Sequence, residues 1–183
     1  LPGLDICDTD ALNTFIIDQH INAAINCAGY TVVDKAEENP EIAEQVNSKG
    51  VLNLVNALKK VDGNLIHIST DYVFDGTNHK PYIETDTPNP QSVYGKTKLE
   101  GELAMKQINP ANSIIVRTSW VYSKFGNNFV KTMLRLGKER DELNVVDDQI
   151  GTPTNAADLA ITILTILPKI NNKNVDLFHY SNE

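Results

Sequence analysis

The stretch NLIHIST, residues 64–70, is a short apolar run that ends in two hydroxyl side chains. Similar runs occur at 23–29 (AAINCAG) and 113–119 (SIIVRTS), and two further candidates lie at 143–148 and 175–180. Most of these runs are almost continuously apolar, which is typical of parallel strands buried on both faces of a sheet. We therefore predict strands over these five ranges.

Segments of helical length separate the predicted strands. Pro40 stands at a plausible first helical position, and apolar residues recur at helical spacing after it. The predicted helices lie within residues 8–20, 40–61, 94–108, 126–139 and 154–167. Strands and helices that alternate at this spacing predict an α/β domain with a doubly wound parallel sheet, a Rossmann-like fold.

The composition narrows the classes of function. The 183 residues are 41% hydrophobic, enough for one domain with its own core, and no apolar run approaches the roughly 20 residues of a membrane span. The net charge of −8 argues against a nucleic-acid partner. Cys7 and Cys27 form no disulfide framework, so we expect buried, reduced thiols and a cytoplasmic protein. The four histidines are scattered, and we expect no metal site.

One long irregular segment, residues 71–92, interrupts the alternation and is rich in proline. A structureless segment of this length in a compact domain is usually functional or disordered. It starts after Thr70, at the carboxyl end of a predicted strand, and ends just before Tyr94 and Lys98 on the next helix. Ligands of doubly wound sheets bind outside the carboxyl ends of the strands, so chemistry is expected here.

Thr70, Tyr94 and Lys98 together can support proton transfer. A Lys98 ammonium group one helical turn from Tyr94 favours the phenolate, which predicts a lowered tyrosine pKa. The Thr70 hydroxyl could hold the same substrate oxygen while a hydride arrives at the carbonyl carbon. The Tyr-x-x-x-Lys spacing alone is weak, because an ordinary exposed contact on a helix gives the same pattern. The strand end and the long segment before it favour the catalytic interpretation.

Longer blocks of the sequence carry a resemblance to a known family. STDYVFDG (69–76), PYIETDTPNPQSVYGKTKLEGE (81–102), RTSWVYSKFGNNFVKTML (117–134) and VVDDQIGTPT (145–154) resemble the signature blocks of the dTDP-4-dehydrorhamnose reductases. INCAGYTVVDKAEENPEIAEQVN (25–47) belongs to the same resemblance. These reductases are extended members of the short-chain dehydrogenase/reductase superfamily. STDYVFDG together with DDQIGTPT is more specific to them than Tyr-x-x-x-Lys.

The resemblance implies hydride transfer from NADPH or NADH to C4 of dTDP-4-dehydro-L-rhamnose, which gives dTDP-L-rhamnose. It implies that Tyr94 is the general acid and that Lys98 tunes Tyr94 and holds the nicotinamide ribose. It implies that Thr70 orients the carbonyl group. The nucleotide sugar is then the small-molecule partner, with neither nucleic acid nor membrane involved.

The resemblance also implies further contacts. Those with the cofactor are Asp5, Ile6, Ala28, Gly29 and Tyr30. Those with the substrate are Asp71, Trp120 and Gln149, in addition to Thr70. Plainer interpretations stay open, because Trp120 could be a core residue, Asp5 a surface carboxylate and Gly29 a tight-turn residue.

The chain departs from the family at the phosphate-binding turn. No G-x-x-G-x-x-G spacing occurs among its ten glycines. The resemblance therefore implies that residues 1–183 are the central part of one NAD(P)-binding domain, without its first βαβ segment and without the C-terminal substrate domain. The start of the substrate-binding part is expected, if present, within 143–183. We expect these residues alone to bind NADPH poorly.

Two other functions remain as alternatives at this point. An epimerase or dehydratase of the same superfamily would act on a nucleotide sugar with a similar tyrosine and lysine. A reductase-like regulatory subunit would keep the fold and do little chemistry, although the intact catalytic set argues against it. A homodimer is possible through a face containing Leu99, Leu103 and Met105, but the same residues fit a core.

Overall fold

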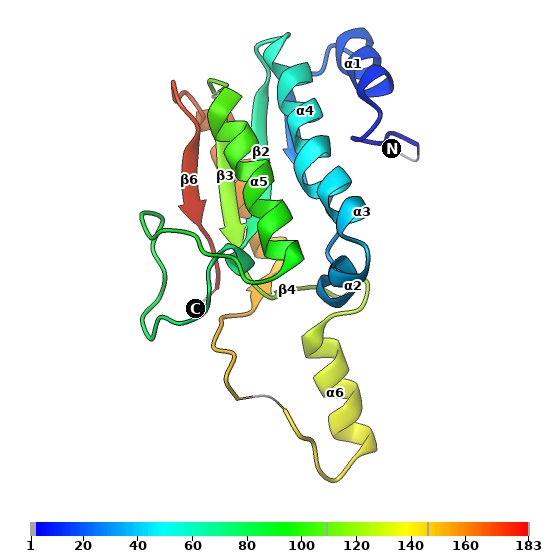
Figure 1. Cartoon of the computed structure of the whole chain (residues 1–183), viewed down its shortest axis with the longest axis vertical. Helices are drawn as coiled ribbons and strands as arrows, with labels where there is room; N and C mark the ends of the chain where they lie inside the picture. The colour runs from blue at the N-terminus through cyan, green and yellow to red at the C-terminus, as the bar shows by residue number, and fades with distance from the viewer. Residues whose placement is uncertain (1–2, 109, 146, 183) are drawn as a thin grey trace.

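The computed structural model describes residues 3–108, 110–145 and 147–182, and a parallel sheet forms its centre (Figure 1). Four strands are arranged in the order β1-β2-β3-β6. They are β1 (Ala23–Asn26), β2 (Asn64–Thr70), β3 (Ser113–Thr118) and β6 (Asp176–His179), all parallel. A separate parallel pair joins β4 (Val121–Tyr122) to β5 (Thr154–Asn155). The predicted parallel α/β fold is confirmed.

Each of the five ranges predicted as helical contains a helix, and a further short helix over residues 33–38 was not predicted. The α-helices are α1 (Thr9–Asp18), α2 (Val33–Glu38), α3 (Pro40–Glu44), α4 (Gly50–Lys59), α5 (Val93–Ile108), α6 (Phe129–Glu139) and α7 (Ala156–Ile166). Short 3-10 turns form η2 (Asp71–Val73) and η3 (Leu167–Lys169). Asp8 caps α1 by accepting a hydrogen bond from the Ala11 amide, and Pro40 opens α3. None of the described helices is long and apolar enough to cross a membrane.

The helix predicted over 40–61 contains a π-helical segment that the sequence pattern does not reveal. This segment, η1 (Gln45–Lys49), joins α3 to α4, and the backbone stays helical at both junctions. The three pieces form one continuous rod in front of the sheet (Figure 1). A π turn changes which side chains face the interior, and such turns are frequent at functional sites.

Helices pack on both faces of the four-stranded sheet. Successive strand side chains point to opposite sides, so each face contributes to its own core. Leu65 and Ile115 belong to one core, which they share with buried residues of α1, α4 and α5. Ile66, Ile114 and Val116 belong to a second core, which they share with α7. Burial on two sides explains the near-continuous apolar runs of β2 and β3, whereas β1 and β6 are only partly buried.

The strand predicted over 143–148 is absent, and this prediction was wrong for the described residues of that range; residue 146 lies outside them. The segment follows α6, which carries no buried residue and extends away from the sheet (Figure 1). Val145 is 52% exposed and has no neighbouring strand. A short apolar run forms a strand only where another strand offers pairing partners, and none is present here.

Candidate active site

The three predicted catalytic side chains meet where β2 ends and α5 begins. Thr70 is the last residue of β2, Tyr94 lies in the first turn of α5, and Lys98 follows one turn later. All three are nearly buried, with exposed fractions of 5%, 9% and 4%. The Thr70 side chain lies near enough to the Tyr94 phenol to lower its pKa through hydrogen bonding. The fold therefore brings these residues together at the carboxyl edge of the sheet.

The pKa of Tyr94 is raised, which contradicts the predicted lowering. Burial is the largest cause, hydrogen bonding with Thr70 opposes it, and the charge of Asp71 adds to the increase. Lys98 does not act as expected because its Nζ donates to the Ile68 carbonyl oxygen at 2.7 Å. Tyr94 therefore keeps its proton at neutral pH, so the phenol has a proton to donate.

Burial lowers the pKa of Lys98 to about 8, from an ordinary 10.5. The negative charge of Glu102 opposes this decrease, and Cys27 adds a smaller contribution in the same direction. Lys98 is thus charged at neutral pH but close to losing its proton. Its ammonium group lies beside the last residues of β2, where it can donate hydrogen bonds to a ligand at the sheet edge.

The turn η2 covers the tyrosine from the other side. Thr70 caps this turn by accepting a hydrogen bond from the Tyr72 amide at 3.2 Å and donates to the Asp71 carboxylate at 3.1 Å. The Tyr72 ring meets the Tyr94 ring edge-on, with centroids 5.5 Å apart. Burial raises the pKa of Asp71. Asp71, predicted as a substrate contact, therefore lies directly beside the Thr70 hydroxyl group.

The predicted cofactor turn, Ala28 to Tyr30, follows β1 and is held by two buried asparagines. Asn26 Oδ1 accepts from the Ala28 amide at 3.1 Å, and Asn47 Oδ1 accepts from the Tyr30 amide at 2.8 Å. Asn47 Nδ2 donates back to the Tyr30 carbonyl oxygen at 3.1 Å. Gly29 is half-buried between these contacts, while Ala28 is exposed. The turn is therefore rigidly placed but accessible.

Asn47 also reaches the catalytic helix, a role that sequence reasoning missed. Its Nδ2 donates to Thr97 Oγ1 at 3.1 Å, and Thr97 in turn donates to the Tyr94 carbonyl oxygen at 3.1 Å. A side chain at Gly101 would overlap the Asn47 carbonyl oxygen, so α5 approaches the π segment backbone to backbone. Glycines inside a predicted helix were the available signal of this close approach.

Cys27 is an exposed residue just beyond β1 and Cys7 is half-buried, so the expectation of two buried cysteines was wrong, although partial burial raises the pKa of both thiols. The predicted strand over 23–29 ends at Asn26, because the Ala28 amide turns back to the Asn26 side chain. This early end leaves the following residues open at the sheet edge.

Asp5 and Ile6, the predicted adenine contacts, lie beside the rod formed by α3, η1 and α4. The Ile6 carbonyl oxygen accepts from Asn53 Nδ2 at 3.1 Å, and the Ile6 side chain packs against Gly50. Asp5 is exposed and accepts from the Cys7 amide at 2.8 Å. Their role with a cofactor stays a prediction.

Trp120 follows β3 in the left-handed backbone region, with φ of 47°. This conformation is rare for a bulky side chain and is found mainly at functional positions. Its indole lies over Gly151, where a Cβ atom would be 3.0 Å from Trp120 Cε2, and 5.6 Å from the Phe129 ring. Gln149 is exposed in the same segment as Gly151. The structure brings Trp120 close to this segment, and no contact of either residue with Tyr94 is recorded among the described residues.

The long segment 71–92 is ordered by the Asp75 carboxylate. This group accepts hydrogen bonds from the Thr77 amide, the Thr77 hydroxyl, the Tyr82 hydroxyl and Asn89 Nδ2, at 2.8 to 3.0 Å. These hydrogen bonds hold the pKa of Asp75 well below its usual range. The His179 amide donates to Glu84 at 2.8 Å, which ties the segment to the end of β6. The segment therefore spans the carboxyl edge of the sheet as a fixed structure.

A buried ion pair beneath the site was also missed. Glu102 on α5 and Arg117 on β3 are 0% and 3% exposed, and two hydrogen bonds join them. Both residues lie in blocks that resemble the family, at the end of 81–102 and at the start of 117–134, but nothing in a single sequence pairs two charges that lie on separate elements. The pair lies one helical turn beyond Lys98.

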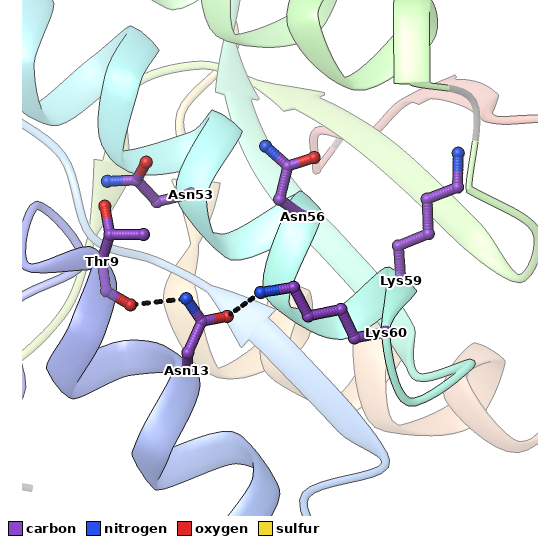
Figure 2. A pocket seen from close by; sticks show the side chains of 6 residues that line it. All are labelled: Thr9, Asn13, Asn53, Asn56, Lys59 and Lys60. Carbon is purple, nitrogen blue, oxygen red and sulfur yellow. Dashed lines mark hydrogen bonds between the residues drawn. The ribbon is translucent and has the colours of Figure 1, made fainter.

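A polar groove of about 490 Å³ lies elsewhere, between α1 and α4 (Figure 2). Its lining residues are Thr9, Asn13, Asn53, Asn56, Lys59 and Lys60. Lys59 donates to the Ile108 carbonyl oxygen at the last turn of α5, roughly 20 Å along the helix from Tyr94. The groove is therefore separate from the catalytic cluster. Across the described residues, no group of three or more His, Cys, Asp or Glu side chains could hold a metal ion.

Comparison with known proteins places this site in a family. A profile described as RmlD substrate binding domain matches residues 2–183. The chain belongs to this family. The resemblance inferred from the sequence blocks is thereby confirmed, and the Thr70, Tyr94 and Lys98 cluster is a site within an RmlD-family fold.

Several relatives of this RmlD-family chain are named dTDP-4-dehydrorhamnose reductase. A Sinorhizobium fredii protein named dTDP-4-dehydrorhamnose reductase is 46% identical over 184 residues, which cover 98% of this chain and 62% of that protein. A crystal structure of a dTDP-4-dehydrorhamnose reductase from Clostridium acetobutylicum has a TM-score of 0.91 at 49% identity, over 98% of this chain and 62% of that one. The Bacillus anthracis enzyme of this name, in complex with NADP, has a TM-score of 0.91 at 42% identity, over 98% and 63%. The chain thus spans less than two thirds of the length of these relatives.

Proposed function

We propose that the protein containing this chain reduces C4 of dTDP-4-dehydro-L-rhamnose with NADPH or NADH and forms dTDP-L-rhamnose. The observation that carries the proposal is the buried cluster of Thr70, Tyr94 and Lys98 at the carboxyl ends of parallel strands. The names of the relatives, and the NADP bound to the Bacillus anthracis enzyme, support the choice of substrate and cofactor.

Tyr94 is the proton donor in this proposal. Its raised pKa keeps the phenol protonated at neutral pH, as a general acid for a reduction requires. The reduced nicotinamide, when bound, supplies the hydride for C4. The Tyr94 proton goes to the C4 oxygen, so that the carbonyl group becomes an alcohol and the balance is complete. Thr70, whose hydrogen bonding lowers the pKa of the phenol against burial, holds the same oxygen in line.

The residues of the sheet edge fit a dinucleotide cofactor. Lys98 has three donors on its ammonium group, and the Ile68 carbonyl oxygen takes one of them, which leaves two for ribose hydroxyls. The turn from Ala28 to Tyr30 lies at the carboxyl end of β1, where doubly wound sheets bind ligands. We assign Asp5 and Ile6 to the adenine side of the same site.

Asp71, Trp120 and Gln149 are assigned to the nucleotide sugar. The assignment of Asp71 is supported by its hydrogen bond with Thr70. That of Trp120 is supported by its left-handed backbone conformation and by the position of its indole over Gly151. The substrate-binding part that starts within 143–183 is proposed on the same basis. We place the enzyme in the cytoplasm, which fits a nicotinamide cofactor and a nucleotide-sugar substrate.

We also propose a homodimer through α5, with a smaller contact face than the sequence predicted. Leu103 is 53% exposed and is available to a partner, whereas Met105 is fully buried in the core and is not. Sedimentation of the protein with Leu103→Ala against wild type tests this face.

The test of the function uses the full protein, its Tyr94→Phe variant and dTDP-4-dehydro-L-rhamnose, with NADPH absorbance as the signal. We expect wild type to oxidise NADPH and the variant to lose a factor of about 10² to 10⁴ in kcat with cofactor affinity unchanged. A wild type that converts the sugar without net NADPH oxidation would indicate an epimerase. One that binds NADPH and leaves the sugar untouched would indicate a regulatory subunit.

A further inference from the structure

A fully buried carboxylate lies one helical turn beyond Lys98. Glu102 accepts from Arg117 Nε at 2.9 Å and from Arg117 Nη2 at 2.6 Å, one to each carboxylate oxygen. Ser69, the neighbour of Thr70 on β2, donates to Glu102 Oε1 at 2.5 Å. The carboxylate is therefore fixed by two strands of the sheet at once, and α5 is fixed with it.

This arrangement is not explained by stability alone. Removing two charges from water is unfavourable, and apolar residues of similar volume often give an equal or greater stability. The Arg117 Nη1 atom is buried without a partner among the described residues, so the pair is incompletely satisfied as well. Arg117 also lies over the Phe74 ring, 5.1 Å from its centroid. Because burial of the Glu102 carboxylate is unfavourable, its presence is more easily explained if a neighbouring group requires its negative charge.

Lys98 is the group that needs it. Its Nζ is aimed at the Ile68 carbonyl oxygen in surroundings that are nearly closed to water. The neighbouring side chains on the sheet do not supply a firm negative charge. Burial together with the charge of Lys98 holds the pKa of His67 well below its usual range, so His67 is neutral. Cys27 is a thiol whose own pKa is raised by burial.

The remaining groups around the lysine lead to the same point. Tyr94, on the same helix, keeps its proton because burial raises its pKa, and Asp71 on η2 acts on Tyr94 and Tyr72. Asn47 and Thr97, between the π segment and α5, are uncharged. Glu102 is the first of the charges that raise the pKa of Lys98 against burial.

We infer that Glu102 is a positioning residue for Lys98, whose carboxylate, fixed by Ser69 and Arg117, keeps the lysine ammonium charged at the Ile68 carbonyl oxygen. The inference rests on the proposed function, because a charged Lys98 matters there for holding the cofactor ribose and for the field at Tyr94. It adds a fourth side chain to the site, one that touches neither substrate nor cofactor.

The test compares Glu102→Gln with Glu100→Gln in the full protein. Glu100 is exposed on the same helix, so its variant makes the same change in net charge without touching the buried pair. We expect the alkaline limb of the kcat/KM profile to move down by about one pH unit in Glu102→Gln and to stay in place in Glu100→Gln. The NADPH dissociation constant, measured by fluorescence over the same pH range, should show the same displacement.

Glu102→Asp keeps the charge and shortens the side chain. We expect this variant to lose stability but to retain an alkaline limb close to that of wild type. A merely structural role would leave the alkaline limb of Glu102→Gln at the wild-type pH as well. If Glu102→Gln does not fold, the double variant Glu102→Gln, Arg117→Met takes its place. This variant also removes a positive charge, so we expect a smaller downward displacement of the alkaline limb. An alkaline limb at the wild-type pH in whichever of the two folds would overturn the inference.

The two proposals fail in different ways. A wild-type protein without reductase activity would refute the proposed function, while the pH dependence of NADPH binding would still decide the role of Glu102. Competitive chemical labelling of lysines adds a measurement that needs no turnover. Lys98 should titrate near 8 in wild type and lower in the folded Gln variant, and equal titration in both would contradict the inference.

Discussion

Asn47→Asp replaces an amide NH2 by a carboxylate oxygen with almost no change in shape, and so it isolates what the Asn47 donor contributes. In wild type this donor serves the Tyr30 carbonyl oxygen and Thr97 Oγ1, both at 3.1 Å. In the variant the new oxygen faces the Tyr30 carbonyl oxygen and repels it. The accepted hydrogen bond from the Tyr30 amide, at 2.8 Å, can remain.

The expected loss of stability follows from these contacts. Each hydrogen bond is worth about 1 kcal/mol, and a buried polar group left without its partner costs about 1 to 3 kcal/mol. Asn47 is 0% exposed, so water cannot replace the lost donor. We expect Asn47→Asp to lower the free energy of unfolding by about 2 to 5 kcal/mol at neutral pH. The deficit should shrink in acid, because a protonated carboxyl group can donate to Tyr30 again.

The assay is urea unfolding of the full protein, combined with hydrogen exchange at the Tyr30 amide and NADPH affinity. The matched control is Asn56→Asp, an exposed position on the same helical rod, where a change within about 0.5 kcal/mol is expected. Faster exchange at Tyr30 together with weaker NADPH binding would show that the turn and the catalytic helix are coupled. Equal unfolding midpoints for the two variants, with Tyr30 still protected, would refute the reasoning.

Three more predictions concern single side chains. Lys98→Met should abolish activity yet raise the free energy of unfolding at pH 7 by up to about 3 kcal/mol, because the folded pKa of Lys98, about 8, lies below the usual 10.5. Chemical denaturation should show that this gain in stability decreases as the pH rises from about 8 to 10.5. Asp75→Ala should accelerate hydrogen exchange at the Thr77 amide, and equal exchange in both proteins at neutral pH would contradict this. In wild type, the contribution of Asp75 to stability is present above its ordinary pKa of 3.8 and should be lost only as the pH falls through the lowered folded pKa. Gly101→Ala should destabilise by about 1 to 3 kcal/mol because α5 meets the Asn47 backbone there, whereas Gly137→Ala in open space on α6 should stabilise by about 0.5 to 1 kcal/mol in the same unfolding assay.

The elements that carry the site were predictable because their signals are local. β2 is a near-continuous apolar run, α5 follows a proline-rich segment, and Thr70, Tyr94 and Lys98 take their positions from those two elements. The strand expected over 143–148 shows the limit of this reasoning. An apolar run indicates only that burial of its side chains is favourable. Whether it forms a strand depends on whether a partner strand lies beside it.

The electrostatics of the site could not be predicted from spacing. The four-residue interval between Tyr94 and Lys98 correctly places both on one face, but the sign of the tyrosine pKa shift depends on burial and on where the ammonium group points. Lys98 turns to the Ile68 carbonyl oxygen, and burial decides the pKa of Tyr94. The partners Asn47, Glu102 and Arg117 come from other elements, so their contacts exist only once the chain has folded.

The two halves of the site differ in how they are held, and this difference has a functional consequence. Thr70, Tyr94 and Lys98 are each at least nine-tenths buried, and their partners all lie within the described chain. Trp120 and Gln149 instead stand beside α6 and the segment after it, where no residue of the helix is buried and Ile150 is 95% exposed. The half that contains Tyr94 is therefore preorganised by the sheet, and on the proposed function the geometry of proton transfer should be insensitive to the bound sugar. Discrimination between nucleotide sugars should then depend on the Trp120 side. Substitutions at Gly151, beneath the indole, should change KM among dTDP-sugars more than they change kcat, and the opposite pattern would place the discrimination at Tyr94.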